Sequence, residues 1–160
     1  MPELAPVVAS TLASYYEEVR DKIHELLEPI STEQFWRKPF PYGNSIGNLL
    51  LHLTGNLNHY IGAHIAGTGY VRNRELEFTD ASKRPDEEVL ADFDRAIAMV
   101  AATIRRQSAE DLVAPYSADT PSNNRFAVFL RMAAHAQHHL GQIIYLVKQL
   151  TQPAPRSAAR

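Results

Sequence analysis

The sequence predicts an all-α protein, a four-helix bundle, on three observations. Four segments carry apolar residues at helical spacing, no segment shows the alternating pattern of a half-buried strand, and no internal repeat is present. The chain has 160 residues, of which 45% are hydrophobic, which suits one domain with a substantial core. We therefore expect a single domain over residues 1–152, followed by a flexible C-terminal tail over 153–160.

Start and stop signals bound each expected helix. The first begins near Pro6 and ends near Leu27, shortly before a proline. The second starts after Ser45, a good N-cap residue, and runs to about Ile65. The third covers about 85–107 and opens with three acidic residues, which the helix dipole favours. The fourth covers about 124–150. Long connections separate the helices, so short hairpins do not fix the topology.

The second helix is apolar nearly all round, which predicts a central, buried position. Four polar residues at spacings of four, four and three form one stripe along it: Asn48, His52, Asn56 and His59. Glycines recur along it at 47, 55 and 62, at spacings of eight and seven residues. Because each glycine costs about 1 kcal/mol in a helix interior, we expect another backbone to approach closely there.

Composition excludes several classes of function. The formal net charge is −2 and the cationic residues are dispersed, so we expect no nucleic-acid partner. The chain has no cysteine, which excludes disulfides and cysteine-ligated zinc. No apolar run approaches the length of a membrane span, and the N-terminus lacks the pattern of a secretory signal. We expect a cytoplasmic protein with no membrane partner.

Three histidines form the candidate reactive site. His135 and His139 stand four residues apart in the fourth helix, so both imidazoles project from one face. His52 lies in the middle of the second helix among leucines. Imidazole fills a core poorly because both ring nitrogens need partners. Two adjacent helices would bring the three rings around one divalent cation and leave a position open for water or substrate.

Other polar residues have two interpretations, as part of this site or as ordinary surface and core residues. The candidates for contact with substrate or support of the ligands are Asn56, His59, Tyr60, His138 and Gln142. His138 is expected at the rim of the site. His24 and His64 have no such context and are expected at the surface. The charged segment 72–84 contains Arg72, Arg74, Glu75 and Glu77. Either these residues recognise a polar substrate, or they belong to a salt-bridged surface loop.

Three stretches, SIGNLLLHLTGN, YVRNRELEF and HAQHHLGQI, together resemble the DinB/YfiT-like superfamily of four-helix metal-binding proteins. The resemblance implies an up-down-down-up bundle with a long crossover between the second and third helices. It also implies that a histidine of the second helix and an HxxxH pair of the fourth bind a divalent metal, which carries over to His52, His135 and His139. Many members are dimers, so a homodimer is expected.

Two functions are compatible with such a site. In the first, the metal activates a low-molecular-weight thiol for transfer to an electrophile, as in some relatives. No carboxylate lies one helical turn from any of the three histidines, so a hydrolase has no evident general base. In the second, the protein is a non-catalytic metal-binding or stress-response protein with a structural site. Three imidazoles suit zinc, nickel, copper and iron, so the identity of the ion stays open.

Aromatic residues outside the inward stripes form a last feature of the sequence. They comprise Tyr16, next to Tyr15 of the inward stripe, together with Phe35, Trp36, Phe40, Tyr42 and Tyr145. A contiguous group of exposed aromatic residues marks a binding surface or a cavity wall. Two arrangements are open: the loop around residues 35–42 caps the metal cavity, or these residues contribute to the homodimer interface.

Overall fold

The structure is a computed structural model and describes residues 3–79, 82–118 and 120–152. Within these residues it is all-helical, and the one β-type pairing is an isolated bridge between Pro115 and Asn124. Four long helices build the body in the described residues: α1 (Leu4–Leu27), α3 (Ile46–Leu57), α5 (Asp86–Arg105) and α7 (Arg125–Thr151). The expected tail over 153–160 lies outside the described residues.

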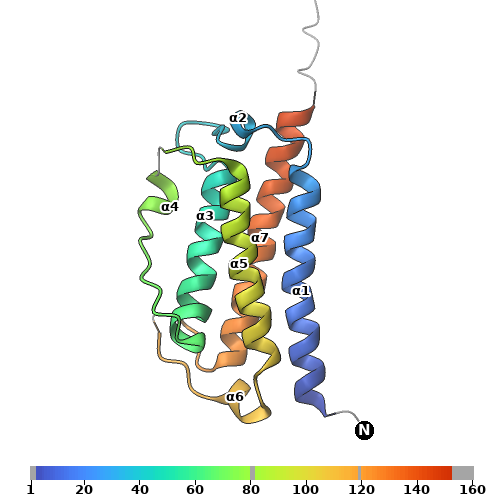
Figure 1. Ribbon diagram of the computed structural model, residues 1–160, viewed down its shortest axis with the longest axis vertical. Coiled ribbons are helices and arrows are strands. Elements are labelled where there is room, and N and C mark those ends of the chain that lie inside the picture. The colour runs from blue at the N-terminus through green and yellow to red at the C-terminus, as the bar shows by residue number, and fades with distance from the viewer. Residues whose placement is uncertain (1–2, 80–81, 119, 153–160) are drawn as a thin grey trace, which may run out of the picture.

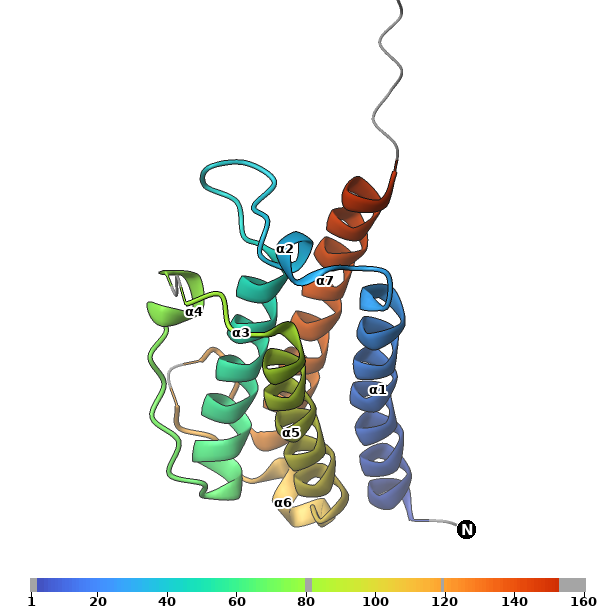
Figure 2. The same cartoon turned by 45° about the horizontal axis from the view of Figure 1, so that its top comes forward.

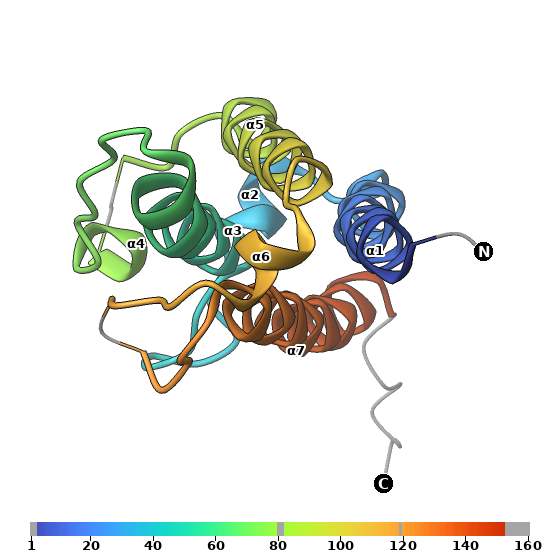
Figure 3. The ribbon, with the colours of Figure 1, turned by 90° about the horizontal axis from the view of Figure 1, so that it is seen from below.

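The long helices pack around one hydrophobic core. Helix α1 packs against α5 and α7, and α3 packs against the same two helices from the other side. Figure 3 shows this arrangement end-on, with α1 and α3 on opposite sides of the bundle. In Figure 1, α1 and α7 run upward while α3 and α5 run downward. The segment between α3 and α5 therefore returns along the whole length of the bundle, outside α3.

Short helices complete the connections. Figure 2 shows α2 (Thr32–Phe35) lying across the end of the bundle where α1 ends and α3 begins. Helix α4 (Leu76–Thr79) packs on the outer side of α3 within the crossover, and α6 (Ala109–Val113) packs on α7. No helix in the described ranges combines the length and apolar character that a membrane span requires.

The helix starts follow the sequence signals closely. Ser45 caps α3 through a capping box, in which its hydroxyl accepts from the Asn48 amide N–H and the Asn48 side chain accepts from the Ser45 backbone. Asn124 caps α7 by accepting from the Ala127 amide at 2.8 Å. Helix α5 opens with Asp86, Glu87 and Glu88 in its first turn. The predicted boundaries of the first, third and fourth helices, and the predicted start of the second, differ from the observed ones by at most a few residues.

The second predicted helix differs from expectation in its last third. It is α-helical only to Leu57 and continues as a π-helix, η1 (Asn58–Ala66), which ends at Gly67 with a left-handed backbone. The π-helix has wider turns, with hydrogen bonds from residue i to i+5, and often occurs near functional sites. The side chains of η1 therefore do not continue the spacing of α3, and His59 departs from the polar stripe of Asn48, His52 and Asn56.

The glycines of α3 make room for side chains, which corrects the expectation of a close backbone. A Cβ at Gly47 would overlap the rings of Phe35 and Trp36, and a Cβ at Gly55 would overlap the carboxylate of Glu77. Both aromatic rings at the α2 end are buried against the bundle. Gly47 thus leaves space for the rings of Phe35 and Trp36, whereas Gly55 leaves space for the side chain of Glu77, which belongs to the crossover.

Candidate metal centre

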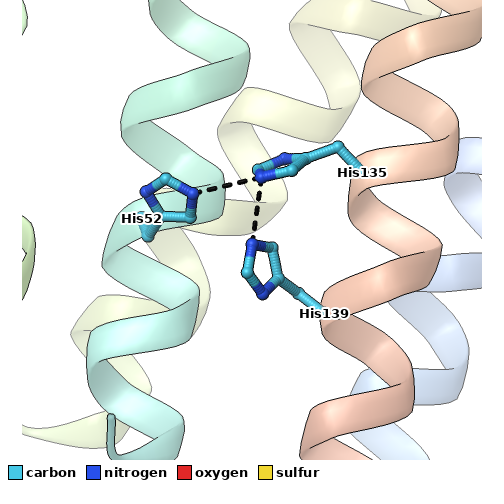
Figure 4. A group of neighbouring side chains, drawn as sticks. All are labelled: His52, His135 and His139. Atoms are coloured by element: carbon cyan, nitrogen blue, oxygen red, sulfur yellow. Dashed lines mark hydrogen bonds between the residues drawn. The ribbon is translucent and has the colours of Figure 1, made fainter. Parts of the chain in front are cut away.

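The three predicted histidines meet between α3 and α7 (Figure 4). The Nε2 atom of His135 lies 3.2 Å from Nε2 of His52 and 3.0 Å from Nε2 of His139. One ligand atom from each ring lies within 4.8 Å of the other two. His52 is buried, and His135 and His139 are partly buried. The group is thus sheltered on the side of α3 and more accessible on the side of α7.

The helix geometry explains why these rings converge. His135 and His139 are one turn apart on α7, so their imidazoles stack along the same face with ring centroids 4.4 Å apart. His52 lies on the face of α3 that packs toward α7, between the buried Leu50 and Leu53. The apolar packing of α3 against α7 sets the distance between the two helices. The histidine side chains lie in the space between them.

The outer nitrogens of two rings are held by acceptors. His52 Nδ1 lies 2.8 Å from the Glu77 carboxylate, and His139 Nδ1 lies 2.7 Å from the side-chain oxygen of Gln142. An N–H must donate in each of these bonds, so both rings carry their proton on Nδ1. This tautomer leaves the lone pair of each Nε2 directed at the centre of the group.

The three Nε2 atoms then present more hydrogen-bond acceptors than the available N–H groups can satisfy. With His52 and His139 both presenting lone pairs, a hydrogen on His135 Nε2 can serve only one of them. A cation satisfies all three lone pairs at once, because neutral imidazole is a good ligand for divalent transition metals. The bonds from the outer nitrogens of His52 and His139 to a carboxylate and an amide are the usual support of metal-binding histidines. The donor set therefore fits a divalent metal ion.

The carboxylate behind His52 belongs to a buried ion pair. Arg72 donates to Glu77 through Nε at 2.6 Å and through a terminal nitrogen at 2.8 Å, and both side chains are almost fully buried. Asn48 donates to the Glu77 carbonyl at 3.1 Å, which ties this part of the crossover to α3. A two-point contact between guanidinium and carboxylate fixes the orientation of the acceptor as well as its charge.

This ion pair corrects the interpretation of the charged segment. Arg72 and Glu77 neither form a surface salt bridge nor face the open side of the site; they support His52 from behind. Arg74 behaves differently, with its guanidinium 5.4 Å from the centre of the Phe78 ring, and Glu75 is exposed. The segment is therefore divided between two buried partners and two exposed residues.

Sequence periodicity could not have identified Glu77. Leu76 is 55% exposed whereas the neighbouring Glu77 is only 5% exposed, the reverse of what their hydrophobicity indicates. The available signal was chemical: a buried metal-binding histidine needs an acceptor for its second nitrogen. A second signal was Gly55, which lies three residues after His52 in the interior of the helix. Its lack of a side chain creates the space for the Glu77 carboxylate.

Burial favours the neutral form of His135 and His139. Burial lowers the pKa of His135 from its ordinary value of 6.5 to about 3, and repulsion from the neighbouring His139 and His52 adds to the effect. The pKa of His139 is also lowered, chiefly by burial. For Glu77, burial alone would raise the pKa, but hydrogen bonds from Arg72 and His52 outweigh it and lower the pKa. Neutral rings beside an ionised carboxylate are the protonation states that a cation requires.

The remaining candidates divide between the two ends of the site. Asn56 and Tyr60 line a pocket that His135 also lines. Gln142 supports His139 and lies 3.4 Å from His138 through its amide nitrogen. His138 is exposed and stacks edge-on beside His139, with ring centroids 5.1 Å apart. His138 and Gln142 thus lie at the solvent side of the group.

His59 belongs to a second histidine group. Its ring centroid lies 4.9 Å from that of the exposed His64 and 4.8 Å from that of Tyr60, and His64 lies 6.0 Å from Tyr116. Burial, followed by repulsion from His64, lowers the pKa of His59. The described residues show no ring contact or hydrogen bond between His59 and the three convergent histidines.

The aromatic residues do not act as one group. Tyr16, Phe35 and Trp36 are core residues, and the Tyr16 hydroxyl donates to the Phe129 carbonyl at 2.6 Å. Phe40 and Tyr42 remain exposed, and so does Tyr145 on α7. These three line a shallow surface pocket together with Gln142, next to the histidines. The early part of the loop therefore caps the bundle, while its later part stays at the surface.

Residues 15–143 match the profile of a protein family described as the DinB superfamily, which covers most of the chain and all three histidines. Among curated proteins, no match to this chain is found.

Proposed function

Because the chain belongs to the DinB superfamily, we propose that it binds a divalent metal ion through His52, His135 and His139 and transfers a small thiol to an electrophile. The directions of the four long helices in Figure 1 support the up-down-down-up bundle of this family. The single observation that carries the proposal is the convergence of three Nε2 atoms, with the ring of His52 oriented by Glu77 and the ring of His139 by Gln142.

The arrangement of carboxylates favours thiol transfer over hydrolysis. Hydrolysis at a metal centre usually needs a general base within reach of the attacking water. Glu77, the carboxylate nearest the three rings in the described chain, contacts the outer nitrogen of His52 and is held by Arg72. Its oxygens therefore support a ligand instead of facing the reacting groups. A thiol has no comparable need for a protein base, because its proton leaves readily to solvent.

The chemistry assigned to the metal is limited to one effect: a bound divalent ion is a Lewis acid that favours the thiolate form of a small thiol. The overall reaction balances without a redox partner. The thiol loses its proton, sulfur forms a bond to an electrophilic carbon, and the leaving group departs with its bonding electrons. The residues of this chain hold the imidazoles neutral, fix their direction and leave the α7 side accessible.

An accessible site is also the reason to prefer an enzyme to a structural site. Closed structural zinc sites use four protein ligands. In the described ranges the group comprises three side chains of suitable chemistry, so a coordination position remains for a small molecule. Zinc, nickel and iron all suit the donor set.

The proposal is tested with protein purified without an affinity tag, since a histidine tag would itself bind metal. Elemental analysis should find about one divalent ion per chain. The loaded protein should accelerate conjugation of a small thiol to a chromogenic aryl halide, and His135→Ala should lose both metal and rate. Full metal loading with no acceleration for any thiol tested would favour the non-catalytic alternative. Retained metal in His135→Ala would remove the proposed ligand set.

The expected homodimer stays a prediction. An apolar surface between α1 and α7 is the candidate contact, where Val7, Phe126 and Leu130 are exposed side by side with smaller apolar residues. Light scattering after size-exclusion chromatography should give twice the chain mass of 17.9 kDa. Leu130→Glu should shift the mass toward the monomer. A wild-type mass of one chain at micromolar concentration would contradict the dimer.

A further inference from the structure

A pocket adjoins the histidine group on the side facing the N-terminal half of α7. Its volume is about 470 Å³, within the range of small-ligand sites. His135 forms part of its wall, so a molecule in this pocket lies directly beside the three imidazoles. Asn56 and Tyr60 contribute from the α3 side, and Met132 contributes an apolar surface.

Arg131 is the charged side chain among the described residues of this wall. It lies four residues before His135 and eight before His139, so all three side chains share one face of α7. Its Nε donates to the hydroxyl of the buried Ser122 at 3.1 Å, which orients the guanidinium. The terminal nitrogens have no hydrogen bond or ion pair in the described part of the chain. A guanidinium fixed at one edge presents its free nitrogens for a two-point contact with an anion.

Asn56 provides an independent indication that the pocket takes a ligand. Only 7% of the surface of Asn56 is exposed. Its side-chain oxygen is buried and accepts no hydrogen bond from the described residues. Buried polar atoms are nearly always paired, so an unpaired one beside a pocket requires an explanation. A ligand that brings an N–H or O–H group into the pocket supplies the missing donor.

We propose that Arg131 forms an anion subsite that binds the carboxylate end of a small molecule whose other end reaches the histidine group, and that an N–H or O–H group of the same molecule donates to Asn56 Oδ1. The inference rests on the proposed function in one respect: the proposed function identifies the group at the other end of the molecule as a thiol. Arg131 lies one helical turn from His135 on the same face of α7, so a short molecule can contact both the guanidinium and the histidine group. The ligand class is therefore a short carboxylate-bearing thiol, with 3-mercaptopropionate as the simplest probe.

The subsite is tested first without metal or catalysis. Propionate is titrated into the metal-free protein while backbone amide resonances are followed by NMR. Saturable shifts at Asn56, Ser122 and Arg131 are expected, and they should disappear in Arg131→Gln. Arg106→Gln removes an exposed arginine at the C-cap of α5 and serves as the charge-matched control, in which the shifts should persist. Absence of saturable shifts in the wild type, or their persistence in Arg131→Gln, would overturn the subsite.

The second measurement addresses the thiol. Zinc-loaded protein is titrated calorimetrically with 3-mercaptopropionate and with the neutral 2-mercaptoethanol. The carboxylate should improve binding by about tenfold or more, and Arg131→Gln should abolish this preference while 2-mercaptoethanol binds as before. Equal binding of the two thiols by the wild type would contradict the subsite. If propionate binds as expected but neither thiol does, the subsite stands and the proposed thiol chemistry fails.

Discussion

The two histidine groups on the continuous helix formed by α3 and η1 differ in what surrounds their rings. His52 points its inner nitrogen toward His135, and its outer nitrogen donates to Glu77. His59, two turns later, contacts His64 and Tyr60 through ring edges instead. Both groups bring imidazoles within 5 Å of one another, so proximity alone does not distinguish them.

The outer partners of the rings distinguish the candidate metal centre from the second histidine group. In the first group a carboxylate and an amide fix the tautomers, so the lone pairs converge on one point. In the second group the described residues offer two histidines and tyrosines, with no third ligand close enough to complete a site. The following changes separate the two groups, from the largest expected effect to the smallest.

Removal of a central ligand should have the largest effect. His135→Ala takes away the imidazole that both other rings face, and we expect zinc affinity to fall by more than the roughly 10–100-fold typical of losing a supporting residue. His64→Ala, in the second group, should leave the affinity unchanged. Isothermal titration calorimetry on tag-free protein measures both. Equal losses in the two variants would mean that both groups contribute to metal binding.

Glu77→Gln should weaken the centre without touching a ligand. The neutral amide accepts a poorer hydrogen bond from His52 and leaves the buried Arg72 without its counter-charge. We expect zinc affinity to fall by about 10–100-fold and the free energy of unfolding by about 3 kcal/mol.

The matched control is Glu75→Gln, two residues away and exposed, which should change neither quantity measurably. Zinc titration and urea unfolding of the metal-free proteins provide the two readouts. Wild-type affinity in Glu77→Gln would show that the carboxylate has no part in supporting the site.

A glycine substitution tests the support of His52 by Glu77 through a steric change, without altering either residue. A Cβ at Gly55 would overlap the Glu77 carboxylate, whereas a Cβ at Gly141 would have no other atom within 4 Å. Gly55→Ala should therefore lower zinc affinity by about tenfold. Gly141→Ala should leave affinity unchanged and raise stability by up to about 1 kcal/mol, because alanine favours the helix. Similar behaviour of the two variants would argue that the carboxylate can move without consequence.

The smallest effect concerns the metal-free protein in mild acid. The pKa of His135 is about 3 in the folded chain and rises toward 6.5 on unfolding. Between these values the unfolded chain binds a proton that the folded chain does not, so stability falls as pH falls below about 6.5. The lowered pKa values of His139 and His59 act in the same direction.

Urea unfolding at pH 7.5 and pH 5 measures this loss. His135→Ala should remove more of the pH dependence than His59→Ala, because the shift at His135 is the larger perturbation. Stability that rises on acidification would contradict the assignment of neutral, buried imidazoles.

Residue spacing and residue type predicted the features that are determined within a single helix. The HxxxH spacing of His135 and His139 and the apolar surroundings of His52 were sufficient to expect three converging rings, which lie together in the structure. Capping by Ser45 followed from residue type. The π-helical turn from Asn58 onward was not predictable, because the apolar pattern of η1 is compatible with an ordinary α-helix.

Features that depend on the crossover lay beyond these rules. Glu77 is buried because Arg72 and His52 compensate its charge, and both partners come from outside its own helical turn. Phe35 and Trp36 are buried because Gly47 leaves space for their rings, whereas Phe40 and Tyr42 in the same loop remain at the surface. Pairings between distant segments decide these cases, and residue spacing carries no information about them.

The most direct test of the central claim is zinc X-ray absorption spectroscopy on tag-free, zinc-loaded protein. The account predicts three imidazole nitrogens at about 2.0–2.1 Å and an additional light ligand from solvent. The spectrum should be unchanged in the His59→Ala, His64→Ala double variant. Two or fewer imidazoles in the wild type, or a spectrum that changes in the double variant, would contradict the assignment of His52, His135 and His139 as the metal centre.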